Sequence, residues 1–129
     1  MLVTYITMDY NTLISTLKKN DNVIATVLFG SRTKGTEKPN SDYDICVFLK
    51  NHDKNKVWEI EKLKTEQFDV IPDNKLPFHV KVEVFKHGKQ IFINDENKYA
   101  FEFYKNLREY QDNLHHYSTL RRYREYLWT

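Results

Sequence analysis

The fold is decided by residues 28–49, LFGSRTKGTEKPNSDYDICVFL. Residues 23–29, which lead into this stretch, are apolar and mostly β-branched, so they predict a buried strand. Gly30 and Ser31 interrupt the run, because glycine permits a tight turn and a close approach of a ligand to the backbone. Residues 32–35 can begin a short helix whose free N–H groups would face the turn and suit a phosphate. Residues 42–49 predict a second strand.

Two acidic residues open the second predicted strand. Asp42 and Asp44 are two positions apart, so their side chains share one face. Neighbouring carboxylates repel each other unless a cation lies between them. Hard oxygen ligands at this spacing suit Mg²⁺, which keeps waters and substrate phosphates in its shell. A phosphate-binding turn beside such a metal site is what transfer of a nucleotidyl group from a nucleoside triphosphate requires.

A third acidic residue, Asp69, lies inside an apolar strand predicted over 67–72 and ended by Pro72. A buried carboxylate is costly without a partner. If this strand pairs beside the second one, Asp69 can reach the same metal ions as Asp42 and Asp44. An exposed acid at a strand end is the alternative. Lys64 and the other charged residues of the preceding helix are expected to form a solvated surface.

The remaining periodicities predict helices alternating with a short strand. Helices are expected over 8–20 with Asp9 as N-cap, after Asp53 as N-cap, over 76–87 with Gly88 at the C′ position, and over 95–127. A short strand is expected over 90–93. Together with the first strands, these elements predict an α+β fold: a small mixed β-sheet with helices packed on it and a long C-terminal helix.

The long C-terminal helix carries an apolar seam, defined by residues that recur at alternating steps of four and three: Phe103, Leu107, Tyr110, Leu114 and Tyr117. A helix this long is expected to overhang the small core or to break near 115–118. An overhang would expose tyrosine and leucine side chains, which favours a partner surface.

Length and charge limit the kind of protein. The 129 residues suit one domain, 1–129, whose residues 95–128 form a C-terminal helical extension. The formal net charge of +2 is nearly balanced, so direct binding of nucleic acid is not expected.

Cysteine usage and hydropathy bear on the compartment. The single cysteine, Cys46, excludes an intrachain disulfide, fits a reducing compartment and is expected to be a small core residue. No run reaches the length of a membrane span, and the N-terminus lacks a signal-peptide pattern. We therefore expect a cytoplasmic protein with no membrane contact.

Gly30-Ser31, ten further residues and Asp42-x-Asp44 resemble the Gly-Ser-x10-Asp-x-Asp signature of the DNA polymerase β-like nucleotidyltransferases. The order of predicted elements is similar, over nearly the whole chain, to the minimal nucleotidyltransferase family, and residues 86–112 resemble the C-terminal portion of its antitoxin branch. The resemblance implies the polymerase β-like fold with ATP as substrate. It implies two Mg²⁺ ions and assigns catalytic and metal-binding roles to Asp42, Asp44 and Asp69. Gly30, Ser31 and Arg32 would bind the nucleotide, with Arg32 or Lys34 either neutralising charge or lying on the helix surface.

The same resemblance implies a partner, a HEPN-domain ribonuclease toxin. The protein would be an adenylyltransferase that neutralises this toxin by transferring AMP from ATP to a toxin tyrosine. Two alternatives remain. A non-catalytic binding antitoxin would keep the fold, although the intact Gly30, Ser31, Asp42 and Asp44 argue against it. A nucleotidyltransferase acting on a small-molecule hydroxyl would need an additional domain or a dimer to complete its acceptor pocket.

Overall fold

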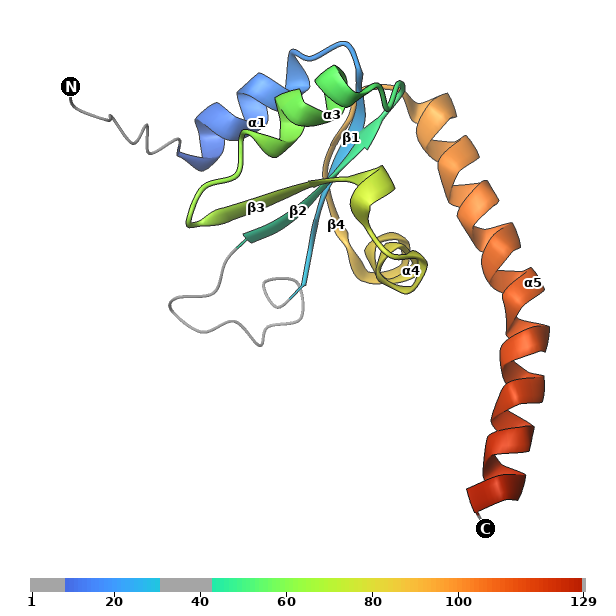
Figure 1. The fold of residues 1–129 in the computed structure, drawn as a ribbon. Helices are drawn as coiled ribbons and strands as arrows, with labels where there is room; N and C mark the ends of the chain where they lie inside the picture. The colour runs from blue at the N-terminus through green and yellow to red at the C-terminus, as the bar shows by residue number, and fades with distance from the viewer. Residues whose placement is uncertain (1–8, 31–42, 129) are drawn as a thin grey trace.

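The computed structural model describes residues 9–30 and 43–128, and describes residues 115–128 by their backbone alone. The elements follow in the order α1 (Tyr10–Lys18), β1 (Val23–Phe29), β2 (Tyr43–Leu49), α3 (Lys54–Glu61), β3 (Phe68–Pro72), η1 (Asp73–Lys75), α4 (Phe78–His87), β4 (Lys89–Ile93) and α5 (Glu96–Trp128) (Figure 1). Apart from the single 3-10 turn η1, this order confirms the predicted succession of helices and strands.

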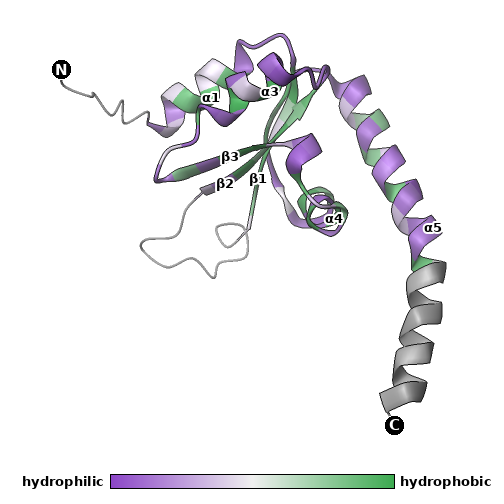
Figure 2. Ribbon diagram, in the orientation of Figure 1, coloured by the Kyte–Doolittle hydropathy of each residue, from purple (hydrophilic) through white to green (hydrophobic). Residues whose placement is uncertain are grey.

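The described strands form one mixed sheet in the order β3-β2-β1-β4. β1 pairs antiparallel with β2 and β4, whereas β2 and β3 run parallel. Residues 23–27 of β1 are all buried, as expected for a central strand covered on both faces, and Figure 2 shows hydrophobic residues along the inner strands. The pairing brings the start of β2 and the start of β3 to the edge of the sheet where β1 ends.

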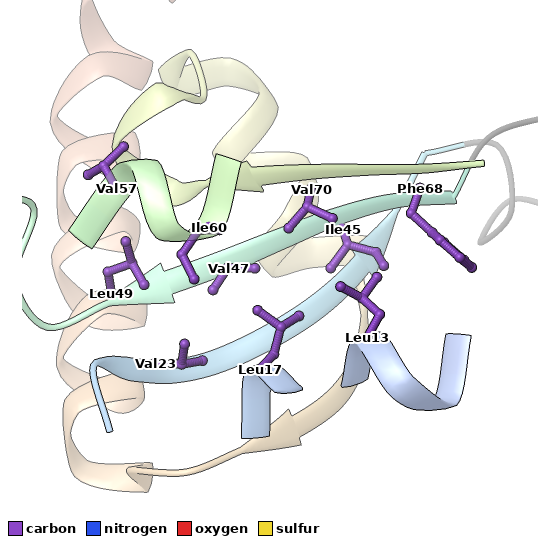
Figure 3. Packing of buried hydrophobic residues seen from close by; sticks show 10 residues of the cluster. All are labelled: Leu13, Leu17, Val23, Ile45, Val47, Leu49, Val57, Ile60, Phe68 and Val70. Atoms are coloured by element: carbon purple, nitrogen blue, oxygen red, sulfur yellow. The ribbon is translucent and has the colours of Figure 1, made fainter. Parts of the chain in front are cut away.

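Helices α1 and α3 cover one face of the sheet (Figure 3). Leu13 and Leu17 of α1 and Ile60 of α3 are almost fully buried there against alternate residues of the strands. Fully burying an aliphatic side chain of this size contributes roughly 1.5–3 kcal/mol. This half of the core therefore fixes the positions of β2 and β3 relative to each other.

The opposite face of the sheet is covered by α4 and α5. Val84 of α4 and Tyr99 of α5 pack there with Cys46 and Phe48 of β2. Cys46 is completely buried and free, so its prediction as a small core residue is confirmed. Burial raises the pKa of the Cys46 thiol well above its usual value.

The helix ends follow the sequence in part. The Asp9 side chain caps α1, because its Oδ1 accepts a hydrogen bond from the Thr12 backbone N–H at 2.7 Å. Asp53 occupies the N-cap position of α3, but its side chain makes no capping hydrogen bond. Its own backbone N–H instead donates to Asn51 Oδ1 at 2.8 Å. The position predicted for the N-cap is therefore correct, but the predicted side-chain capping by Asp53 is wrong, since the Asn51 side chain makes the hydrogen bond at this turn.

Gly88 ends α4 for a different reason from the one predicted. It is the C-cap residue with φ −67°, an extended conformation open to any residue, and not a left-handed C′ glycine. A Cβ at this position would lie 2.3 Å from the Val84 carbonyl oxygen and 2.5 Å from Val27 Cγ1. Close packing between α4 and β1 explains the glycine here.

Helix α5 is continuous from Glu96 to Trp128 and runs past the body of the domain (Figure 1). The predicted overhang is thus confirmed, without a break at 115–118. Asp95 precedes the helix and its Oδ1 accepts a hydrogen bond from the Lys98 backbone N–H at 3.1 Å. No helix in residues 9–30 and 43–128 is long and apolar enough to cross a membrane.

The seam on α5 packs on the domain only at some of its positions. Phe103 meets Phe85 edge to face with ring centroids 5.6 Å apart, and Lys86 Nζ lies 4.6 Å from the centroid of the Tyr110 ring. Leu107 and Leu114 remain 37% and 46% exposed. The Tyr117 side chain lies outside the part of the chain that is described.

Candidate active site

The candidate site lies where β1 ends and where β2 and β3 begin. Asp44 of β2 and Asp69 of β3 are register partners in the parallel pair, so their side chains leave the same face of the sheet. Asp44 is half-buried, and the Asp69 side chain is 33% exposed. The expectation that the strand of Asp69 pairs beside the strand of Asp44 is confirmed.

Aromatic packing fixes these strand starts from the other face. The rings of Tyr43 and Phe68, which immediately precede Asp44 and Asp69, have centroids 5.4 Å apart, and the Tyr10 ring of α1 lies within 6.1 Å of both. Because side chains alternate along a strand, apolar residues at 43 and 68 turn the following carboxylates toward the opposite face. Local alternation thus positions the acidic pair.

Gly30 closes the site from the end of β1. It has φ +85°, a left-handed conformation that glycine adopts without strain. A Cβ at Gly30 would lie 2.3 Å from Asp44 Oδ2. The turn and the carboxylate are therefore fitted against each other, and only a residue without a side chain leaves room for Asp44 in this position.

Lys64 is a site residue that the sequence interpretation missed. Its Nζ lies 3.6 Å from Asp69 Oδ1, whereas the sequence placed Lys64 on a solvated helix surface. The side chain is still 65% exposed, so the solvated part of that prediction holds. The sequence signal that could have identified Lys64 is its position, since it and Asp69 flank the same short turn.

The described residues fit a divalent cation. Asp44 and Asp69 offer hard carboxylate oxygens on one face, and Gly30 keeps backbone rather than side chain beside them. Within residues 9–30 and 43–128 no group of three acidic, histidine or cysteine side chains is positioned as a metal site. The remaining proposed metal ligand, Asp42, and the nucleotide-binding candidates Ser31 and Arg32 lie outside the described residues.

The fold is that of the nucleotidyltransferases. The model of the family described as polymerase beta, nucleotidyltransferase, matches residues 11–97. A protein of Methanocaldococcus jannaschii, provisionally named a protein adenylyltransferase, is 33% identical over 90 residues, which cover 70% of this chain and 71% of that protein. The chain therefore belongs to the polymerase β family of nucleotidyltransferases.

Solved structures share the fold. A chain of a toxin–antitoxin complex crystallised with AMP-PNP superposes with a TM-score of 0.66 at 24% identity, over 87% of this chain and 95% of that one. A chain from the complex of tri-AMPylated Shewanella oneidensis HEPN toxin with MNT antitoxin gives a TM-score of 0.57 at 21% identity, over 83% and 88% of the two chains. At these identities the likeness establishes the common fold.

Proposed function

We propose that this protein is an Mg²⁺-dependent protein adenylyltransferase that acts as an antitoxin. It transfers AMP from ATP to a tyrosine of a cognate HEPN ribonuclease toxin. The observation that carries the proposal is the pairing of Asp44 with Asp69 beside the left-handed Gly30, in a chain of the nucleotidyltransferase family. The named activity of the archaeal relative and the HEPN–MNT complex among the structural neighbours support the choice of acceptor.

The roles of the residues follow from their chemistry. The backbone at Gly30 lets the triphosphate approach closely, while the Ser31 hydroxyl donates to a phosphate oxygen and Arg32 offsets negative charge. Asp42, Asp44 and Asp69 would hold two Mg²⁺ ions. When bound, these ions supply neutralisation of charge at the α-phosphate and activation of the attacking oxygen.

In the proposed reaction Asp69 accepts the proton from the acceptor tyrosine. The tyrosine oxygen forms a bond to the α-phosphorus, and the bond from that phosphorus to the bridging oxygen of the β-phosphate breaks. Pyrophosphate leaves with that oxygen. ATP is a cytoplasmic substrate, so we place the protein in the cytoplasm.

The proposal is tested with two forms of labelled ATP. The protein, Mg²⁺ and purified toxin are incubated with ATP labelled at the α-phosphate and, in parallel, at the γ-phosphate. We expect the toxin to acquire only the α label, and a toxin with its acceptor tyrosine replaced by phenylalanine to acquire none. Neutralisation of the toxin without consumption of ATP would instead support a non-catalytic binding antitoxin. Labelling of a small hydroxyl compound and not of the toxin would support the small-molecule enzyme.

A further inference from the structure

An ion pair joins Lys64 to Asp69, one of the two described carboxylates of the candidate site. Lys64 Nζ approaches Asp69 Oδ1 to 3.6 Å, and Asp69 is the register partner of Asp44. Two adjacent carboxylates repel each other, and a nearby cation reduces that repulsion. The ammonium group of Lys64 therefore provides positive charge at the carboxylate to which the proposed function assigns a metal ion.

The backbone makes this contact more than an accidental surface pair. Lys64 and Asp69 flank a turn that Thr65 closes: the Thr65 N–H donates to the Phe68 carbonyl oxygen at 2.9 Å, and Thr65 Oγ1 accepts from the Phe68 N–H at 3.0 Å. Thr65 Oγ1 also accepts from the Gln67 N–H at 3.3 Å. Because the Phe68 ring is anchored in the core, the turn holds the Lys64 backbone at a fixed place across from Asp69.

We propose that Lys64 is a built-in counter-cation that stabilises Asp69 beside Asp44 and competes with a divalent metal for that carboxylate. This inference rests on the proposed function, because it takes Asp69 as a metal ligand. Lys64 holds Asp69 in position before metal and nucleotide arrive, and the metal must then displace it. Lys64 thereby lowers the affinity of the site for a free metal ion. It lowers the affinity less for a metal ion bound to a triphosphate, because the triphosphate brings negative charge with it.

Metal affinity tests the competition directly. Binding of Mn²⁺ in the absence of nucleotide is measured by electron paramagnetic resonance for wild type, Lys64→Gln and Lys64→Arg. We expect Lys64→Gln to bind Mn²⁺ about two- to fivefold more tightly, which is the range for a solvent-exposed ion pair, and Lys64→Arg to bind as wild type does. The gain should shrink as ionic strength rises, since salt screens exposed charges.

A matched control separates the contact from the general field of the protein. Lys62 is also exposed and lies two residues from Lys64. In the described part of the chain, Lys62 forms no ion pair with Asp69. Lys62→Gln changes the net charge equally and should leave Mn²⁺ affinity within about 1.5-fold of wild type, since only the screened field changes. In an Asp69→Asn background, Lys64→Gln should no longer have an effect.

Thermal unfolding gives a second readout that does not depend on catalysis. In metal-free buffer Lys64→Gln should lower Tm by about 1–3 °C, because the carboxylate repulsion is no longer offset, and saturating Mg²⁺ should remove that difference. Unchanged or weaker Mn²⁺ binding by Lys64→Gln, with wild type binding normally, would overturn this inference and leave the proposed function standing. Failure of wild type to bind Mn²⁺ even in the presence of a non-hydrolysable ATP analogue would overturn both.

Discussion

At the scale of single residues, Gly30 has two independent reasons to be glycine, its positive φ and its contact with Asp44. We predict that Gly30→Ala loses about 1–2 kcal/mol of stability from the left-handed backbone alone. The added methyl group must also displace the Asp44 carboxylate, so Mn²⁺ affinity should fall. Thermal unfolding and metal titration measure the two effects separately.

Gly88→Ala is the matched control for that variant. Its Cβ would meet the Val84 carbonyl and Val27, and Val27 is the register partner of Cys46, so neither contact is with Asp44 or Asp69. We expect it to lower stability while the folded protein retains its metal affinity. Should Gly30→Ala bind metal as well as wild type does, the fit between Gly30 and Asp44 would have no part in the site.

Asp44 is predicted to serve binding at the expense of stability. Replacing it by asparagine removes one of two adjacent like charges, so Asp44→Asn should leave the metal-free fold intact or slightly more stable. Mg²⁺-dependent ATP binding should collapse at the same time. The measurements are Tm in the presence of a chelator and ATP titration with Mg²⁺. A large drop in Tm would show that Asp44 has a structural role instead.

Cys46 makes the stability sensitive to alkaline pH. Burial raises the pKa of its thiol above the usual 9.0, so the thiol loses its proton more readily in the unfolded chain. This contribution to stability is therefore complete below about pH 9 and is lost as the pH rises beyond it. Urea unfolding at pH 7 and pH 10 should show a smaller loss for Cys46→Ala than for wild type. Equal losses would assign the alkaline sensitivity to other groups, such as Tyr99, whose pKa burial also raises.

Much of the site could be predicted because it depends on short-range patterns. The break at Gly30 and the alternation of Asp44 with apolar neighbours are visible in the sequence, and the structure places both at one edge of the sheet. Lys64 was missed because its contact depends on how the turn at Thr65 closes, which side-chain hydrogen bonding decides. Gly88 was predicted to be the C′ residue of a helix, but its actual constraint is contact with Val27, a residue distant in sequence.

At the scale of the element, α5 combines a packed part with an exposed part. Tyr99 is buried among Phe48 and Phe85, whereas Leu107 and Leu114 face solvent. The packed residues and the exposed residues of α5 have similar apolar character. Periodicity alone could therefore predict the seam but not which of its residues contact the domain. The strand order had the same limit, since pairing is decided by contacts between distant segments.

We predict that the exposed part of α5 binds the toxin. Leu107→Ser combined with Leu114→Ser should change Tm little, because both side chains are already more than a third exposed, and should weaken toxin association at least tenfold. Trp58→Ser is the control: it removes an aromatic side chain, 62% exposed, from α3. Size-exclusion chromatography and calorimetry of the mixture measure the association. Equal loss in both variants would argue against α5 as the docking surface.

Truncation is a poorer test of the same idea. Ending the chain after Asn94 would remove Tyr99, which is only 7% exposed and completes the core on the α4 face. Loss of a buried aromatic residue typically costs about 3–5 kcal/mol. A truncated protein would therefore lose toxin binding and fold together, whereas the paired leucine replacements separate the two.

At the scale of the whole molecule, the candidate active site and the exposed part of α5 are built from different elements. The site uses the ends of β1, β2 and β3, and the exposed seam residues belong to a helix that contacts β1 and α4. This arrangement predicts that catalysis and association can be separated by mutation. Replacing Asp42 and Asp44 together should abolish transfer of label from α-labelled ATP to the toxin, because the proposed metal ions lose two of their three protein ligands.

The same Asp42 and Asp44 double variant should retain most of its affinity for the toxin, since neither residue lies on α5. The Leu107 and Leu114 double variant should show the reverse: normal Mg²⁺-dependent ATP binding, but labelling of the toxin that recovers only at raised toxin concentration. Such a dependence identifies a defect in association, because an intact site still transfers AMP once the toxin is bound. If the carboxylate variant labels the toxin as wild type does, the assignment of Asp42 and Asp44 fails. If both variants lose toxin association to the same extent, the candidate active site and the exposed part of α5 belong to one toxin-binding surface.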